Sequence, residues 1–254
     1  MACFLPSGVH RQTREEDRFL SHVAPGPTNT SVILPAFNEE LGLAATLRAI
    51  RDSGTGVEVI VVDDGSTDGT AAVVTGDGTL LLQHSKNRGK GSAFRTGAAH
   101  AGGDRIVIMD ADATYPASAI ARVSELLDDH DYVSAARKKG RAHIPLLNRL
   151  GNTAIASAIR LVSGSRLSDP LTGMYGLRRD ALEALDLRSD GFGLETEVAI
   201  KAARAGLRTT EIEIEYGERA GQSKLNPIRD GLAIARTIGQ LMFDGRGRRR
   251  RKVA

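Results

Sequence analysis

Short apolar runs alternate with helical patterns between residues 31 and 136. The runs are nearly free of polar positions, which is typical of parallel strands covered on both faces. They lie at residues 31–35, 57–62, 80–82, 106–109 and 132–136. Between the runs, apolar residues recur three or four positions apart, as Leu43, Leu47 and Ile50 do, which predicts amphipathic helices. The alternation predicts an α/β fold built on a doubly wound, mainly parallel sheet.

The pattern changes after residue 137, where longer helices are expected. From Thr209 to Tyr216, large apolar side chains alternate with glutamates, which predicts a half-exposed strand at a sheet edge. Apolar residues at helical spacing predict three helices, at 144–162, 194–205 and 228–243. A segment that contains Pro and Gly predicts a tight turn at 169–173.

Composition indicates one α/β domain at 31–244, with a flexible N-terminal extension at 1–30 and a basic tail at 245–254. The chain is 41% hydrophobic and 26% charged, and its apolar runs are all too short to cross a membrane. A single cysteine, Cys3, leaves no internal disulfide and favours the cytoplasm. The net charge of +3 and the 4% of aromatic residues argue against a nucleic-acid partner.

Two carboxylates follow the strand predicted at 106–109. Asp110 and Asp112 are two positions apart, so on an extended chain both side chains reach one spot beyond the strand's carboxyl end. A divalent cation with oxygen ligands would relieve their mutual repulsion. The residues are equally compatible with an Asx turn, which needs no metal.

Two other strand ends carry polar loops. One is residues 35–39, and the other begins with Asp63 and Asp64. Adjacent parallel strands would bring these loops to the same rim as Asp110, where ligands bind in open α/β sheets. Lys90, in a glycine-rich turn before a helix, would add positive charge there.

These motifs, taken in order, closely resemble family 2 glycosyltransferases of the GT-A fold. The residues that carry the resemblance are ILPAFNEE at 33–40, VVDDGSTDG at 61–69, NRGKG at 87–91 and DAD at 110–112. The second half resembles the branch that contains dolichyl-phosphate mannose synthases and other polyprenyl-phosphate glycosyltransferases, through DPLTGM at 169–174, GFGLE at 191–195 and RAGQSKL at 219–225. The resemblance covers residues 31–240.

The resemblance implies a nucleotide-sugar donor held beside Mg²⁺ or Mn²⁺. Asp110 and Asp112 would bind the metal across the donor diphosphate. The donor would contact Pro35, Ala36, Phe37, Glu39, Asp63, Asp64, Lys90, Ala111, Arg137, Arg219 and Lys224. The acceptor would contact Arg149, Gln222 and Ser223, although Arg149 also suits a solvated helix position.

The implied reaction is one in-line displacement at the anomeric carbon, which inverts its configuration. A phosphate acceptor, with a second pKa of about 6, would need no general base. A hydroxyl acceptor would need one, for which Asp169 and Glu195 are the candidates. The expected acceptor is a polyprenyl or dolichyl phosphate, and the alternative is a soluble small molecule.

Two departures from the family pattern bear on this acceptor. Thr114 stands where the synthases typically carry glutamine, which weakens the case for mannose, and the C-terminal membrane helices of many relatives are missing.

Two other functions fit the sequence less well. A pyrophosphorylase would want an arginine-rich phosphate loop after the first strand, and a regulatory sugar-nucleotide-binding module would not need the metal pair. Six basic residues between 246 and 252 follow an apolar helix face, which suits peripheral contact with the anionic inner face of a membrane.

Overall fold

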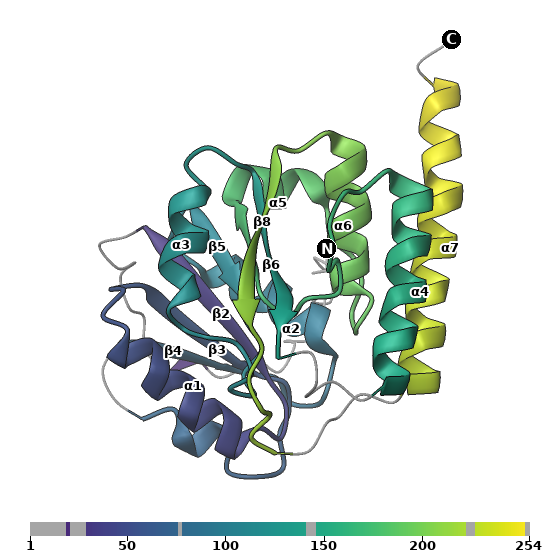
Figure 1. Ribbon diagram of the computed structural model, residues 1–254. Helices are drawn as coiled ribbons and strands as arrows, with labels where there is room; N and C mark the ends of the chain where they lie inside the picture. Colours follow the sequence, from purple (N-terminus) through teal and green to yellow (C-terminus); the bar gives the residue numbers. More distant parts are fainter. Residues whose placement is uncertain (1–18, 21–28, 76–77, 141–145, 222–226, 252–254) are drawn as a thin grey trace, which may run out of the picture.

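The computed structural model describes residues 19–20, 29–75, 78–140, 146–221 and 227–251. In these residues, an eight-stranded sheet in the order β1-β4-β3-β2-β5-β7-β6-β8 is flanked by helices (Figure 1). The strands are β1 Phe19–Leu20, β2 Thr30–Ala36, β3 Glu58–Asp63, β4 Thr79–Gln83, β5 Arg105–Ile108, β6 Tyr132–Lys139, β7 Tyr175–Arg178 and β8 Thr209–Glu215. The helices are α1 Glu40–Asp52, the short 3₁₀ helix η1 Ala71–Val73, α2 Lys90–His100, α3 Ala119–Leu126, α4 Leu146–Ser163, α5 Arg179–Leu185, α6 Leu194–Ala205 and α7 Pro227–Arg251.

The sheet is mainly parallel, as predicted. Strands β4, β3, β2 and β5 run parallel to one another, and β8 runs parallel to β6 at the far edge. Strand β7 is antiparallel to both β5 and β6 and lies between them. The sequence did not predict β7 or α5, because the YGLR segment contains a glycine and no apolar run. That glycine, Gly176, lies under α3: an added Cβ would lie 2.6 Å from Val123 Cγ1.

Helices cover both faces of the sheet. On β2, the buried side chains of Val32 and Leu34 join the core beneath α1 and α3, while Ile33 joins the core beneath α2 and α6. Helices α4 and α7 pack against α6 and against each other, outside the second layer (Figure 1). This two-sided burial explains the nearly continuous apolar runs of the central strands.

Two helix starts differ from what the residue types favour. Asparagine often caps a helix and proline often opens one. Asn38 does not cap α1, because its backbone is left-handed (φ 53°) and its side chain accepts a hydrogen bond from the Thr67 amide at 2.8 Å. Helix α3 starts at Ala119, three residues after Pro116.

The two ends of the chain also differ from the expectation. Helix α7 continues past residue 243 to Arg251, so most of the predicted basic tail has a helical backbone, and its end projects beyond the other helices (Figure 1). Within the N-terminal extension, Phe19 and Leu20 pair with β4, and the rest of 1–28 lies outside the described residues. None of the described helices is long and apolar enough to cross a membrane.

Candidate donor and metal site

The three polar loops predicted to share one rim do so. Strand β2 is hydrogen-bonded to β3 on one side and β5 on the other, all parallel, so 35–39, 63–67 and 110–114 follow neighbouring strand ends. Helix α1 packs directly on the aspartate loop, because an added Cβ on Gly42 would lie 2.7 Å from Asp112 Cα. Helix α1 therefore supports the aspartate loop.

Asp112 is the more buried of the two paired aspartates. Its Oδ1 accepts hydrogen bonds from the Thr114 amide at 3.1 Å and the Thr114 hydroxyl at 2.5 Å. Its Oδ2 lies 2.7 Å from a guanidinium nitrogen of Arg219, which also pairs with Glu39. Burial, and then the charge of Asp110, raise the pKa of Asp112 above its ordinary value despite Arg219. Thr114, the departure from the family pattern, therefore orients Asp112.

Asp110 is the more accessible aspartate, with 30% of its side chain exposed. Lys90 Nζ lies 2.6 Å from Asp110 Oδ1 and 2.5 Å from Glu195 Oε1. Burial alone would lower the pKa of Lys90, but the two carboxylates outweigh it and raise that pKa. Burial raises the pKa of Glu195, although Lys90 opposes it. Lys90 and Glu195 thus join the metal pair in one charged cluster.

Arg137 and Asp169 form a second buried pair near the same rim. The Arg137 guanidinium donates to both carboxylate oxygens of Asp169, at 2.6 and 2.8 Å, and the Arg137 amide donates to Oδ2 at 3.1 Å. The guanidinium carbon also lies 5.5 Å from the ring centroid of Tyr216. Tyr115, edge-on to Tyr216, accepts a hydrogen bond from the Gly173 amide at 2.6 Å.

Asp63 and Asp64 both have protein partners. Asp64 accepts hydrogen bonds from the Arg88 and Gly89 amides at 2.9 and 2.7 Å, and lies 2.6 Å from His84 Nδ1. Asp63 accepts from the Ser66 amide at 2.9 Å and from Gln83 at 3.2 Å. Asp64 therefore fixes the glycine-rich turn that carries Lys90, whereas Asp63 binds the turn that follows its own strand.

The other predicted site residues fall into three groups. Pro35 and Phe37 are half-buried at the rim, and Ala36 and Ala111 are buried there. Arg149 is exposed on α4. Gln222, Ser223 and Lys224 lie outside the described residues.

Four residues that the sequence analysis did not select also shape the site: Thr114, Tyr115, Gly173 and Tyr216. Only Thr114 had a local signal, because a threonine two positions after an aspartate can donate back to its carboxylate. The others depend on contacts between distant segments. The backbone of 217–221, for example, lies over the aspartate loop, with Gly217 and Ala220 donating to the carbonyls of Thr114 and Asp112 at 2.8 and 3.1 Å.

The charges of this site suit a divalent cation. In the ion pairs between described residues of the site, carboxylates outnumber cations by five to three. The carboxylates are Glu39, Asp110, Asp112, Asp169 and Glu195, and the cations are Lys90, Arg137 and Arg219. No group of three or more His, Cys, Asp or Glu among the described residues could hold a metal unaided. Asp110 and Asp112 would therefore share a hard cation with oxygens of a bound ligand, as Mg²⁺ commonly requires.

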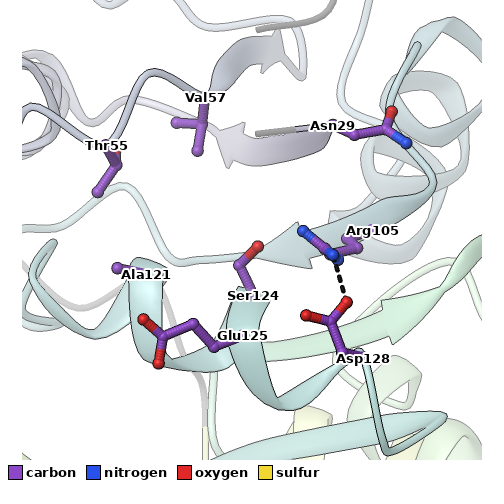
Figure 2. Close-up of a pocket in the computed structure, with 8 residues that line it drawn as sticks. All are labelled: Asn29, Thr55, Val57, Arg105, Ala121, Ser124, Glu125 and Asp128. Atoms are coloured by element: carbon purple, nitrogen blue, oxygen red, sulfur yellow. Dashed lines mark hydrogen bonds and ion pairs between the residues drawn. The ribbon is translucent and has the colours of Figure 1, made fainter. Parts of the chain in front are cut away.

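A cavity of about 450 Å³ lies elsewhere, at the opposite ends of the strands (Figure 2). Its wall includes Asn29, Val57 and Arg105, which precede or begin β2, β3 and β5, and Arg105 pairs there with Asp128. This cavity faces away from the aspartate pair and brings no set of metal ligands together, so it is not the candidate site.

A carboxylate pair at the rim of a GT-A-like sheet defines a nucleotide-sugar glycosyltransferase, and comparison with known proteins agrees. The chain belongs to glycosyl transferase family 2, whose model matches residues 31–186. The family that the sequence motifs suggested and the predicted GT-A class of fold are both confirmed.

Curated relatives align over most of the chain. Glycosyltransferase AglJ of Haloferax volcanii is 33% identical over 213 residues, which covers 82% of this chain and 70% of the relative. The dolichyl-phosphate hexose transferase of the same organism is 31% identical, covering 85% and 95%. An undecaprenyl-phosphate mannosyltransferase of Micrococcus luteus is 30% identical, covering 76% and 86%.

Solved structures support the fold. Glucosyl-3-phosphoglycerate synthase from Mycobacterium tuberculosis, in complex with Mn²⁺, UDP-glucose and phosphoglyceric acid, superposes with a TM-score of 0.67 at 25% identity. The match covers 84% of this chain and 79% of that one. The same enzyme has also been solved with Mg²⁺ and UDP.

Proposed function

We propose that this protein is a metal-dependent, inverting glycosyltransferase that moves a hexose from a UDP- or GDP-sugar to a polyprenyl or dolichyl phosphate. The observation that carries the proposal is the charged cluster at the rim: a pair of adjacent aspartates whose neighbours are cations already balanced by other carboxylates. Such a cluster accepts a metal–diphosphate group and has no need of a free base.

The metal would be held by Asp110 and Asp112. Bound Mg²⁺ or Mn²⁺ would neutralise the negative charge that develops on the departing diphosphate. Arg219 and Lys90 are the nearest cations to these aspartates, and each can turn from its carboxylate partner toward a donor phosphate. Asp63, Phe37 and Glu39 lie along the neighbouring strand ends, where the base and ribose would bind.

The contacts of Asp169, one of the two candidate bases, favour a phosphate acceptor. Asp169 accepts three hydrogen bonds from Arg137. A carboxylate that stabilises a buried cation is a poor proton acceptor, because protonation would leave that cation unpaired. Burial raises the pKa of Glu195 despite Lys90, so Glu195 would be the base for a hydroxyl acceptor. A phosphate needs no base, since it is already largely ionised at neutral pH. The names of two relatives, a dolichyl-phosphate hexose transferase and an undecaprenyl-phosphate mannosyltransferase, support the same acceptor class.

A lipid acceptor would place the protein in the cytoplasm with peripheral contact at the inner face of the membrane. Helix α7 carries the chain to Arg251, and its last turns contain five of the six basic residues. Clustered cations contribute about 1 kcal/mol each near anionic headgroups.

A soluble phosphorylated acceptor is the second candidate. It is favoured by the solved complex of the glucosyl-3-phosphoglycerate synthase, which holds phosphoglyceric acid beside UDP-glucose and Mn²⁺. Phosphoglyceric acid carries a hydroxyl as well as a phosphate, and transfer to that hydroxyl would need a general base.

An acceptor screen separates the two candidates. Radiolabelled UDP-glucose, UDP-N-acetylglucosamine, GDP-mannose and UDP-galactose would each be incubated with Mn²⁺ and one of three acceptors: polyprenyl phosphate, the unphosphorylated polyprenol, or phosphoglyceric acid. We expect transfer to polyprenyl phosphate with one donor and none to polyprenol. Transfer to phosphoglyceric acid alone would establish the soluble acceptor, and transfer to polyprenol would show that a base operates.

A further inference from the structure

Lys90 is bound between a predicted metal ligand and a carboxylate with no assigned role. Its Nζ lies 2.6 Å from Asp110 Oδ1 and 2.5 Å from Glu195 Oε1. The side chains of Lys90 and Glu195 are 13% and 7% exposed, whereas that of Asp110 is 30% exposed. The lysine therefore approaches the accessible aspartate from the protein interior, while the solvent side of Asp110 stays open to a metal.

The backbone that carries Lys90 is fixed. The Gly89 amide donates to Asp64, and the Ser92 amide donates to the Asp190 carbonyl at 3.1 Å. Neither glycine beside Lys90 can change, because an added Cβ on Gly89 would lie 3.0 Å from the Asp190 carbonyl carbon and one on Gly91 would lie 2.9 Å from that of Ser189. Only the flexible lysine side chain can redistribute its charge between the two carboxylates.

The backbone that carries Glu195 is also fixed. Glu195 is in the first turn of α6, where the helix dipole favours a negative charge. The loop before that helix is held by Glu197, which accepts hydrogen bonds from the Arg188 amide at 3.0 Å and the Ser189 amide at 2.7 Å. Glu195 therefore offers Lys90 a buried carboxylate on a fixed backbone.

We infer that Glu195 is a positioning residue that retains Lys90 when a divalent cation binds Asp110, and so sets the affinity of the site for metal. The inference rests on the metal site proposed above. A lysine on Asp110 competes with the cation for the same carboxylate charge. Because Glu195 is the other partner, it draws the lysine charge away from Asp110 and leaves that aspartate available.

This arrangement predicts opposite effects for the two partners. Lys90→Met removes the competitor and should tighten metal binding in the absence of nucleotide. Glu195→Gln leaves Lys90 paired with Asp110 alone and should weaken metal binding. Each change should be about fivefold, the equivalent of roughly 1 kcal/mol for a partly accessible ion pair. If Lys90 and Glu195 had only a structural role, both substitutions would weaken metal binding.

The chain contains a matched control for the lysine on the same helix as Glu195. Lys201 Nζ lies 2.6 Å from Glu197 Oε1, and this pair is distinct from the aspartates. Lys201→Met removes a lysine from a Lys–Glu pair without touching Asp110 or the hydrogen bonds that Glu197 accepts from the preceding loop. It should leave metal affinity unchanged.

The test is titration of the full chain with Mn²⁺ alone, with free Mn²⁺ measured by electron paramagnetic resonance. Thermal unfolding without metal would confirm that each variant is folded. We expect Lys90→Met to bind more tightly than wild type, Glu195→Gln more weakly, and the double variant to resemble Lys90→Met. The inference would be overturned if both single variants bound Mn²⁺ more weakly than wild type, or if Glu195→Gln had the Mn²⁺ affinity of wild type. In either case, Mn²⁺ binding by the wild type would still support the metal site. Failure of the wild type to bind Mn²⁺ without nucleotide would overturn this inference, whereas the metal–nucleotide site is tested by nucleotide titration with Mn²⁺ and with EDTA.

Discussion

Replacing Gly173 with alanine should disable the metal pair without altering any metal ligand. Gly173 is in the turn between α4 and β7, with its amide 2.6 Å from Tyr115 Oη. A Cβ added there would lie 2.5 Å from Asp110 Cγ. Carbon atoms prefer separations of about 3.5–4.0 Å, so the Asp110 carboxylate must move by about 1 Å or more.

The expected size of the effect follows from that displacement. A misplacement of about 1 Å at a reacting centre costs about 10²-fold in rate, so activity at saturating donor should fall by that factor. The fold should survive, because the displaced atoms are the end of a side chain and an off-rotamer aspartate costs about 1 kcal/mol. The assay is initial-rate transfer across a Mn²⁺ titration, with a thermal melt of each protein.

The control is Gly191→Ala, since a Cβ at that loop glycine would meet nothing within 4 Å. It should leave both rate and melting temperature near those of wild type. If Gly173→Ala retains full activity at limiting Mn²⁺, Asp110 does not bind the metal in the conformation described. A large loss of stability in Gly173→Ala would show that the turn, rather than the carboxylate, gives way.

Three other outcomes are expected. Asp63→Ala should weaken nucleotide binding, measured by calorimetry, with little change in stability. Asp64→Ala should lower the free energy of unfolding by about 1–3 kcal/mol, because it removes the acceptor of buried hydrogen-bond donors. Equal effects of the two substitutions in both assays would contradict these roles. The Arg208 hydrogen bond lowers the pKa of Asp131, so chemical denaturation should show stability falling as pH drops through that depressed pKa, and Asp131→Asn should remove this dependence. Full-length protein should co-sediment with anionic liposomes at low salt, and a chain ending at Asp244 should not; if both stay in the supernatant, the soluble acceptor gains support.

The fold was predictable where one short segment carried the whole signal. The apolar runs of β2, β3 and β5 are buried on both faces, so their composition alone indicates parallel central strands. Strand β7 could not be found this way, because its place between β5 and β6 depends on pairing with segments about 40 and 70 residues away in the chain. The extension of α7 was missed because a run of arginines reads as a solvated tail, although arginine is a good helix former.

The site divides along the same line. Asp110 and Asp112 were predicted from their position after a strand, and in the structure β5 ends at Ile108 and both aspartates lie in the loop that follows. Lys90, Arg219 and Glu195 were predicted to belong to the same site. Their particular ion pairs were not predicted, because these side chains meet only through the tertiary fold. Spacing in the sequence can therefore indicate a metal-binding pair, and it cannot show which cations occupy that pair or which carboxylates balance them.

The most direct test of the metal-dependent donor site is calorimetric titration of UDP and GDP into wild type and Asp112→Asn, each with Mn²⁺ and with EDTA. Asn keeps the shape of the side chain and removes one charged ligand, so a hard cation should bind far more weakly. We predict that Mn²⁺ tightens nucleotide binding to wild type by at least about tenfold and has no effect on Asp112→Asn. Equal nucleotide affinity in Mn²⁺ and EDTA for the wild type would contradict the account.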